Sequence, residues 1–250
     1  MITITMQSKA AIEYLERDKY TNLNTLGFLC NSDEAEIYLY NGDTENGVIV
    51  GDKEQDFFFL NTHDTGFLRE FWEIIPPGHK CFSGVPEPIA RIFMADKKTV
   101  WQNPCKVFAL KGEFKRPEDT LYTVESLTLA DAEEVDRYYT YRSEESLDRI
   151  RENIARFDST CIRVNGQLAS WSTVHTEDCS MGPLYTKEEY RGQGMAEAVS
   201  SRLMEKLIAK HIIPYVQIIK HNNASLHLAG RLKGLEYSHD CIWFGIDKPE

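Results

Sequence analysis

The chain has 250 residues, of which 42% are hydrophobic and 27% are charged, and its formal net charge at pH 7 is -11. These are ordinary globular values, and the length is enough for two domains or one large one. Non-specific nucleic-acid binding needs a basic footprint, so the acidic balance and the absence of long Lys/Arg runs disfavour it.

The cysteines and the apolar segments exclude several further classes. Six cysteines are scattered along the chain and form no C-x-x-C pair, so we expect neither a zinc ribbon nor a redox dithiol, and no metal site. The first twenty residues carry charges and no apolar core segment, which argues against a signal peptide. No apolar run approaches the length of a membrane span. We therefore expect a soluble, cytoplasmic protein without membrane partners.

Hydrophobic patterning predicts a full set of elements in the N-terminal half. The expected order is a helix, three strands, a helix, a strand, a helix and a strand. The segments are, in that order, 8–17, 36–40, 47–50, 56–60, 67–75, 80–83, 86–95 and 100–110. Lys, Glu, Arg, Pro and Asp concentrate at 111–120, which is expected to be a linker.

The C-terminal half continues with a second mixed series. Asn165-Gly166 is the best two-residue hairpin signal in the chain and is expected to join two strands. The predicted segments are a strand at 122–128, helices at 129–135 and 144–157, strands at 161–164, 168–177 and 181–186, a helix at 195–210, a strand at 215–219, a helix ending at Gly234 and closing strands within 237–246. This pattern predicts an α+β fold with a central mixed sheet flanked by helices.

The most informative motif lies between the strand at 181–186 and the long helix that follows. It reads Arg191-Gly192-Gln193-Gly194-Met195-Ala196. A strand, a glycine-rich turn and a helix form an arrangement that binds pyrophosphate, since glycines allow a close approach and the helix N-terminus carries partial positive charge. An arginine adds a forked donor for phosphate oxygens. The alternative interpretation is an ordinary loop or a glycine cap.

The segment 121–246 resembles the core of the GNAT superfamily of acetyl-coenzyme A-dependent N-acetyltransferases. The turn of that superfamily follows the pattern Q/R-x-x-G-x-G/A, and Arg191, Gly194 and Ala196 occupy its three specified positions. The approach from Thr186 to Arg191 and the run Asn222-x-x-Ser225-x-x-Leu228-Ala229 are similar to the branch that includes zwittermicin A resistance proteins. The resemblance implies a GNAT-like sheet and a coenzyme site at this turn.

The resemblance also implies which residues hold acetyl-coenzyme A. The pantetheine arm is expected along the strand before the turn, and the thioester where the two central strands part. Asn222 and Ser225 match positions that contact the arm, although both also suit a helix cap. The expected coenzyme-binding residues are Leu184, Tyr185, Thr186, Arg191, Gly192, Gln193, Gly194, Met195, Ala196, Asn222 and Ser225.

The candidate general bases are Glu177 and His175. Acetyl transfer requires the acceptor ammonium to lose a proton, and strand alternation places both side chains on one face with Trp171. The alternative is that both lie at a solvated strand end. Asp178 points the other way in this alternation.

Two positions depart from the superfamily pattern. Ala229 stands where many members carry a tyrosine that protonates the departing thiolate, which leaves Tyr185, Tyr190 or solvent to act as the acid. Lys233 stands where a glycine usually follows the helix, with Gly234 displaced by one.

The N-terminal half matches a shortened copy of the same series. Its corresponding turn, 61–66, has one glycine and no arginine, and Asp64 there would repel a pyrophosphate. We therefore expect residues 1–115 to form a degenerate GNAT-like domain without a coenzyme site and residues 120–250 to form the catalytic domain. The alternative is an unrelated α+β domain.

The resulting hypothesis is an acetyl-coenzyme A-dependent N-acetyltransferase that acts on the amine of a small molecule by direct attack in a ternary complex. The alternative is a catalytically silent acyl-coenzyme A-binding regulatory module. The sequence leaves the acceptor and the oligomeric state open.

Overall fold

The computed structural model describes residues 1–32, 35–52, 56–115 and 121–250. Contacts divide the chain into two compact units. Unit 1 contains Met1–Val107, Gln217–His221 and Tyr237–Glu250, and unit 2 contains Phe108–Val216 and Asn222–Glu236. Two C-terminal segments therefore group with the N-terminal half, whereas the expected boundary lay at 115–120. Residues 116–120 of the expected linker lie outside the described residues.

The N-terminal run forms every segment predicted for it, each as the expected type. Two additional elements, β1 and α2, were not predicted. Sequence patterning missed α2 because Asn24, Gly27 and Asn31 are weak helix formers. The elements are β1 (Ile2–Thr5), α1 (Lys9–Leu15), η1 (Glu16–Asp18), α2 (Leu23–Asn31), β2 (Glu36–Tyr40), β3 (Val48–Asp52), β4 (Phe57–Asn61), α3 (Thr65–Ile74), β5 (Gly78–Pro86), α4 (Glu87–Met94) and β6 (Thr99–Leu110).

The C-terminal run contains the predicted hairpin. Asn165 and Gly166 have φ angles of 52° and 80°, which suit a tight turn between antiparallel strands. The elements are η2 (Leu129–Asp131), α5 (Ala132–Arg137), α6 (Ser146–Arg156), β7 (Thr160–Val164), β8 (Gln167–Val174), β9 (Met181–Thr186), η3 (Glu188–Tyr190), α7 (Met195–Ala209), β10 (Tyr215–Ile219), α8 (Asn223–Ala229) and β11 (Leu235–Lys248).

Three expectations for this run were wrong. Residues 122–128 form no strand, and only Glu125 makes a bridge, with Cys161, because the Leu127 N–H donates to the Ser159 hydroxyl instead of a ladder carbonyl. The strand expected at 168–177 ends at Val174, after a bulge. The helix expected to reach Gly234 ends at Ala229.

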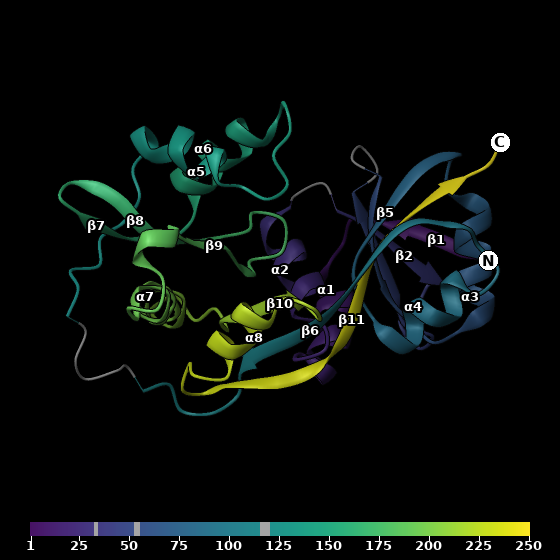
Figure 1. Ribbon diagram of the computed structural model, residues 1–250. Coiled ribbons are helices and arrows are strands. Elements are labelled where there is room, and N and C mark those ends of the chain that lie inside the picture. Colours follow the sequence, from purple (N-terminus) through teal and green to yellow (C-terminus); the bar gives the residue numbers. More distant parts are fainter. Residues whose placement is uncertain (33–34, 53–55, 116–120) are drawn as a thin grey trace. The chain divides into compact units, whose positions relative to one another are not determined.

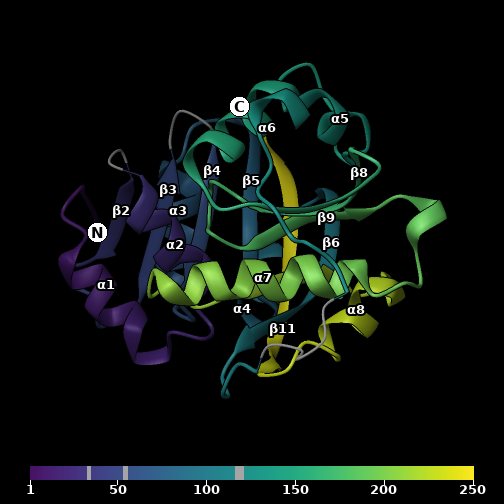
Figure 2. The same cartoon turned by 90° about the vertical axis from the view of Figure 1, so that its left-hand side faces the viewer.

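The strands form a mixed sheet of eight and a sheet of three. The larger sheet has the order β1-β2-β3-β4-β5-β11-β6-β10, in which β4 and β5 are parallel and β1 to β4 pair antiparallel in succession. The smaller sheet has the order β7-β8-β9 and is antiparallel. Figure 1 labels most of these elements, and Figure 2 also labels β3 and β4. The predicted α+β class, with a mixed sheet flanked by helices, is confirmed.

Unit 1 buries apolar side chains on both faces of its sheet. Phe58, Phe71 and Phe82 belong to the core under α3 and α4, and Phe28 and Phe59 belong to the core under α1 and α2. Successive residues Phe58 and Phe59 thus serve opposite faces, as strand pleating requires. The two helix pairs can be followed in Figure 2.

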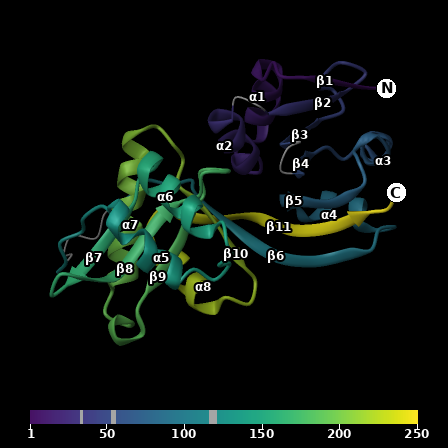
Figure 3. The same cartoon turned by 90° about the horizontal axis from the view of Figure 1, so that it is seen from above.

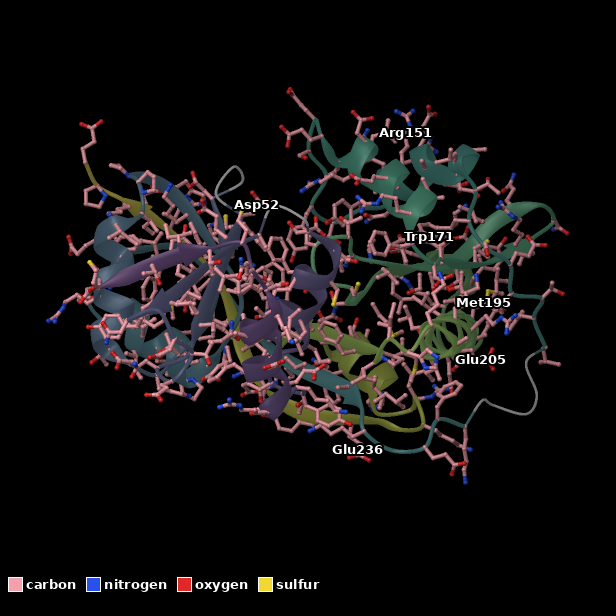
Figure 4. All side chains as sticks on the ribbon, turned by 180° about the vertical axis from the view of Figure 1, so that it is seen from behind. Asp52, Arg151, Trp171, Met195, Glu205 and Glu236 are labelled. Carbon is pink, nitrogen blue, oxygen red and sulfur yellow. The ribbon has the colours of Figure 1, made fainter. Side chains whose placement is uncertain are left out.

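Unit 2 repeats this layering around the smaller sheet. Trp171 and Cys161 lie in the core under α5 and α6, whereas Ile162, Met195 and Val199 lie in the core under α7. Figure 3 shows α5, α6 and α7 around β7 to β9, and Figure 4 shows Trp171 and Met195 on opposite sides of this sheet. The α7 core therefore fixes the start of α7 against the sheet that contains β9.

The two runs share one order of elements. Each reads strand, helix, helix, three strands, helix, strand, helix and strand, with the Glu125 bridge in place of the first strand of the second run. In the part of the chain that the structure describes, no helix is both long and apolar enough to cross a membrane.

Asp131 is the buried carboxylate that organises the start of α5. Its Oδ2 accepts hydrogen bonds from the Thr128 N–H and hydroxyl at 2.7 and 2.8 Å and from Arg163 Nη2 at 2.8 Å. Burial alone would raise the pKa of Asp131, but the hydrogen bonds from Arg163 and Thr128 outweigh it and lower that pKa. The ionised form therefore stabilises the folded chain.

We expect Asp131→Asn to lower the free energy of unfolding by about 1–2 kcal/mol at pH 7, because charge-assisted hydrogen bonds are lost. A carboxyl with a lowered folded pKa contributes stability above its unfolded pKa and loses it as the pH falls through the folded pKa. The difference between variant and wild type should shrink below about pH 4. Urea unfolding at pH 7 and pH 3 measures both effects, and an equal difference at the two pH values would contradict the assignment.

Candidate functional site

The predicted coenzyme strand, β9, is an edge strand of the smaller sheet. It pairs with β8 through Trp171↔Tyr185 and Ser172↔Leu184, and within the described residues no strand pairs with its other edge. Strand β10 belongs to the larger sheet, and the thioester position stays a prediction.

The turn after β9 requires glycine for its backbone conformation. Gly192 and Gly194 have φ angles of 74° and 84°, which L side chains rarely adopt. A Cβ added at either position would meet nothing within 4 Å. The protein itself does not crowd these glycines, so the space beside them is open to a ligand.

Helix α7 begins directly behind this turn and has no side-chain cap. Gly194 is its N-cap residue and Met195 its first helical residue. The first N–H groups of a helix have no partner within the helix, and together with the helix dipole they favour an anion. The exposed glycines, the open space and the uncapped helix fit a pyrophosphate group. The residues that would hold it are Arg191, Gly192, Gln193, Gly194, Met195 and Ala196.

Arg191 lies across the end of β9. Its Nε donates to the Thr186 carbonyl at 3.1 Å, its Nη1 lies 3.4 Å from Glu188 Oε1, and its guanidinium lies 5.6 Å from the Tyr185 ring centroid. The side chain is 53% exposed. The Arg191 guanidinium is therefore anchored to β9 through its Nε and remains accessible at the turn.

Tyr122 holds the turn from a distant part of the chain. Its hydroxyl donates to the Gln193 carbonyl at 2.7 Å, and the Gln193 amide donates to the Glu189 carbonyl at 3.1 Å. Sequence reasoning placed Tyr122 in a strand and missed this contact, because no local pattern links residues 71 positions apart.

The remaining residues of β9 alternate between the two cores. Leu184 packs against the core under α7, and Tyr185 stacks on Tyr138 with ring centroids 4.8 Å apart. The Thr186 hydroxyl lies 2.8 Å from the Ser170 hydroxyl. Side chains of this strand are thus held by the protein, and a coenzyme arm would be recognised through the backbone of its open edge.

Lys187 extends this surface beside the aromatic pair. Its Nζ lies 2.5 Å from Glu134 Oε1 and 5.8 Å from the Tyr138 ring centroid. Burial lowers the pKa of Lys187, but the hydrogen bond and charge of Glu134 outweigh it, so the pKa is raised. Lys187 therefore stays positively charged one residue after the coenzyme strand.

Asn222 has the capping role that was the alternative to coenzyme contact. Its Oδ1 accepts from the Ser225 N–H at 3.1 Å, at the start of α8. Arg231, just after α8, pairs with Glu197 in the first turn of α7. This ion pair joins the α8 region to the helix that carries the turn, while contact of Asn222 and Ser225 with coenzyme stays a prediction.

His175 and Glu177 lie in the connection between β8 and β9. Because β8 ends at Val174 after a bulge, strand alternation does not extend to these residues. The connection is closed by the His175 N–H, which donates to the Ser180 carbonyl at 2.9 Å. The structure thus places both candidate bases in one turn, partly exposed, beside the start of the coenzyme strand.

The two candidate bases have different surroundings. A Cβ added to Gly182 would lie 2.8 Å from His175 Nε2, so this imidazole packs on the backbone of β9. Burial raises the pKa of Tyr139, the positive charge of Arg149 opposes this rise, and the negative charge of Glu177 adds to it. Glu177 is therefore within electrostatic range of Tyr139, in the connection between α5 and α6.

Among the described residues, no three His, Cys, Asp or Glu side chains gather as metal ligands. The chemistry that this arrangement can support is binding of an anionic group at the turn and proton transfer at the start of β9.

Residues 161–244 match the family model described as FR47-like protein. Human glycine N-acyltransferase-like protein 1 is 29% identical over 109 residues, which are 43% of this chain and 35% of that protein. The chain thus spans about a third of the length of this curated relative. The matched family region contains β9, the turn and α7.

Solved structures match over nearly the whole chain. A Drosophila protein has a TM-score of 0.68 at 13% identity, covering 93% of this chain and 96% of its own. A GNAT-family acetyltransferase from Colwellia psychrerythraea has a TM-score of 0.57 at 11% identity, with coverages of 99% and 100%. A GCN5-related N-acetyltransferase from Sphaerobacter thermophilus has a TM-score of 0.57 at 12% identity, with coverages of 99% and 96%. The fold is therefore that of GNAT acetyltransferases, as the resemblance implied.

We expect Tyr122→Phe to weaken acetyl-coenzyme A binding about fivefold, because one hydrogen bond that holds the turn, worth about 1 kcal/mol, is lost. Calorimetric titration measures the change. Tyr237→Phe is the matched control, since the Tyr237 hydroxyl donates to Asp240 in unit 1. Equal affinities for both variants would contradict a role of Tyr122 in the site.

Proposed function

We propose that the protein is an acetyl-coenzyme A-dependent N-acetyltransferase that transfers an acetyl group to the amine of a small molecule by direct attack in a ternary complex. The observation that carries this proposal is the uncapped N-terminus of α7 behind two open, left-handed glycines. The fold and the FR47-like match of residues 161–244 support it.

The coenzyme, when bound, supplies an acyl thioester. The turn from Arg191 to Ala196 holds its pyrophosphate through backbone N–H groups, and the open edge of β9 from Leu184 to Thr186 binds the arm by backbone pairing. Asn222 and Ser225 contribute from α8. Positioning of the thioester against the amine provides most of the rate in such a site.

The acceptor ammonium must lose its proton before attack, since its free pKa is about 10. His175 and Glu177 are the candidate bases, and both lie beside the start of β9. Glu177 and the connection between α5 and α6 also provide negative charge and aromatic surface for a cationic acceptor. Glycine, which appears in the name of the human relative, is one acceptor to test.

The coenzyme site is tested by calorimetric titration of Gly194→Asp with acetyl-coenzyme A. We expect binding to weaken at least about 100-fold, because the new side chain strains a left-handed position and places a carboxylate where the pyrophosphate binds. Gly166→Asp is the matched control. Gly166 has a φ of 80° and open space like Gly194, but lies in the hairpin turn between β7 and β8.

Wild-type protein should bind one equivalent, because among the described residues the open glycine turn before an uncapped helix lies in the C-terminal run. In the N-terminal run, Asp64 caps α3 by accepting from the Phe67 N–H at 2.8 Å, which places a carboxylate at that helix start. This supports the proposal of a degenerate N-terminal domain. Two equivalents would contradict it, and equal weakening in Gly166→Asp would contradict the coenzyme assignment.

Turnover is tested by free-thiol release from acetyl-coenzyme A with a panel of amines that includes glycine. We expect His175→Gln or Glu177→Gln to lower kcat at least about 100-fold while coenzyme affinity stays unchanged, since general-base catalysis contributes a factor of this size. The variant that loses turnover identifies the base. Thiol release at background level across the panel would contradict the enzymatic proposal.

A catalytically silent acyl-coenzyme A-binding module is the second candidate. Ala229 stands at the position where many members of the superfamily carry a tyrosine, and it is 2% exposed. An alanine side chain has no hydroxyl that could protonate a thiolate. Saturable coenzyme binding without turnover would favour this candidate. The closer resemblance to zwittermicin A resistance proteins and a cytoplasmic location stay predictions.

A further inference from the structure

The connection between β8 and β9 contains a buried carboxylate that the sequence interpretation set aside. Asp178 is 1% exposed, and its Oδ1 accepts from the Ser180 N–H at 3.0 Å and from the Ser180 hydroxyl at 2.7 Å. The Cys179 N–H donates to the His175 carbonyl at 3.0 Å, which closes the same turn. These hydrogen bonds close the turn, and the Asp178 side chain is buried in it.

Tyr215, the first residue of β10, joins this cluster. Its hydroxyl donates to the Asp178 carbonyl at 2.6 Å, and the side chain is 2% exposed. Burial, followed by the negative charge of Asp178, raises the pKa of Tyr215 well above its usual range. The hydroxyl therefore remains a donor at neutral pH and links the start of β10 to the turn before β9.

His175 lies in the same turn, where its N–H donates to the Ser180 carbonyl. Its imidazole packs on Gly182, where even one added carbon would lie 2.8 Å from Nε2. Gly182 is the second residue of β9, and the expected coenzyme arm begins at Leu184. The imidazole is thus held at the end of β9 where an acyl group would follow the arm.

We propose that Asp178 is a positioning residue that, with Ser180 and Tyr215, holds the His175 imidazole against the start of β9 for proton transfer from the acceptor. This rests on the proposed function. In the step, the acceptor N–H proton passes to the imidazole, the C–N bond forms as the C–S bond of the thioester breaks, and the thiolate leaves with the coenzyme and takes a proton from solvent. Ionised Asp178 stabilises the imidazolium that forms.

The position is costly for a carboxylate. Burial raises the pKa of Asp178, and the negative charge of Glu177 raises it further. The positive charge of His175 and the hydrogen bonds from Ser180 lower it, but burial outweighs them. The titratable groups that face Asp178 are His175, Glu177, Cys179 and Tyr215. A carboxyl with a raised folded pKa favours folding while protonated, and stability is lost as the pH rises from its unfolded to its folded pKa. At pH 7, which is above its unfolded pKa, this carboxyl therefore destabilises the fold.

The test is Asp178→Asn, which keeps an oxygen acceptor for Ser180 and removes the charge. We expect its unfolding temperature at pH 7 to rise by about 2–4 °C. The gain should vanish below about pH 3, under the unfolded pKa of about 3.9, where the wild-type carboxyl is protonated in both states. Its kcat should fall at least about tenfold, with the KM for acetyl-coenzyme A unchanged within about twofold. Higher stability with lower turnover is the result that a merely structural carboxylate would not produce.

Asp131→Asn is the matched control, because Asp131 is also a buried carboxylate of unit 2 but lies at the start of α5. It should lower stability and leave kcat unchanged. A third readout needs no coenzyme. The chain has seven histidines, and the NMR signals of the His175 ring are assigned by their loss in His175→Gln. In the free protein at pH 7, these signals should move in Asp178→Asn and stay in place in Asp131→Asn.

Three outcomes would overturn the role of Asp178. One is a loss of stability in Asp178→Asn like that in Asp131→Asn. Another is unchanged kcat, and the third is unmoved His175 signals. Wild-type protein that binds coenzyme but shows no turnover would overturn the proposed function and this role together, whereas turnover retained by Asp178→Asn would overturn the role alone.

Discussion

The candidate site depends on the left-handed backbone of Gly192 and Gly194. This conformation ends the connection after β9 without a side-chain cap and leaves the first N–H groups of α7 unpartnered. Unpartnered donors at a helix start favour an anion, and the open space beside both glycines gives it room. The Arg191 and Tyr122 contacts then hold the turn in this conformation. The proposed phosphate site therefore rests on backbone geometry more than on side-chain charge.

The two faces of the smaller sheet support this turn from opposite directions. Met195 and Val199 anchor the start of α7 in one core, and Trp171 with Tyr138 and Tyr185 anchors β9 in the other. A helix and a strand that are packed independently cannot easily change the angle at which the turn joins them. This rigidity preorganises the donors, which is the property that makes fixed dipoles effective in binding and catalysis.

The two runs of the chain show how one residue separates an open helix start from a closed one. Both contain three strands followed by a helix in the same order of elements. In the N-terminal run the Asp64 carboxylate caps α3, whereas in the C-terminal run Gly194 leaves α7 uncapped. In the first arrangement the carboxylate accepts from the Phe67 N–H and would repel an anion, whereas the second leaves the helix start open to one. The same order of elements therefore accommodates a capped helix start and the proposed binding turn.

The sequence alone determined the features that depend on neighbouring residues. Hydrophobic periodicity predicted most strands and helices, Asn165-Gly166 predicted its hairpin, and the spacing of Arg191, Gly194 and Ala196 predicted the turn, because backbone conformation is a local property. Only the tertiary structure decided the contacts that hold the site. Tyr122 meets Gln193, and Tyr215 meets Asp178, through side chains far apart in the chain. Their proximity is a property of the packed fold and has no local pattern in the sequence. Strand alternation could not place Asp178, because β8 ends at Val174.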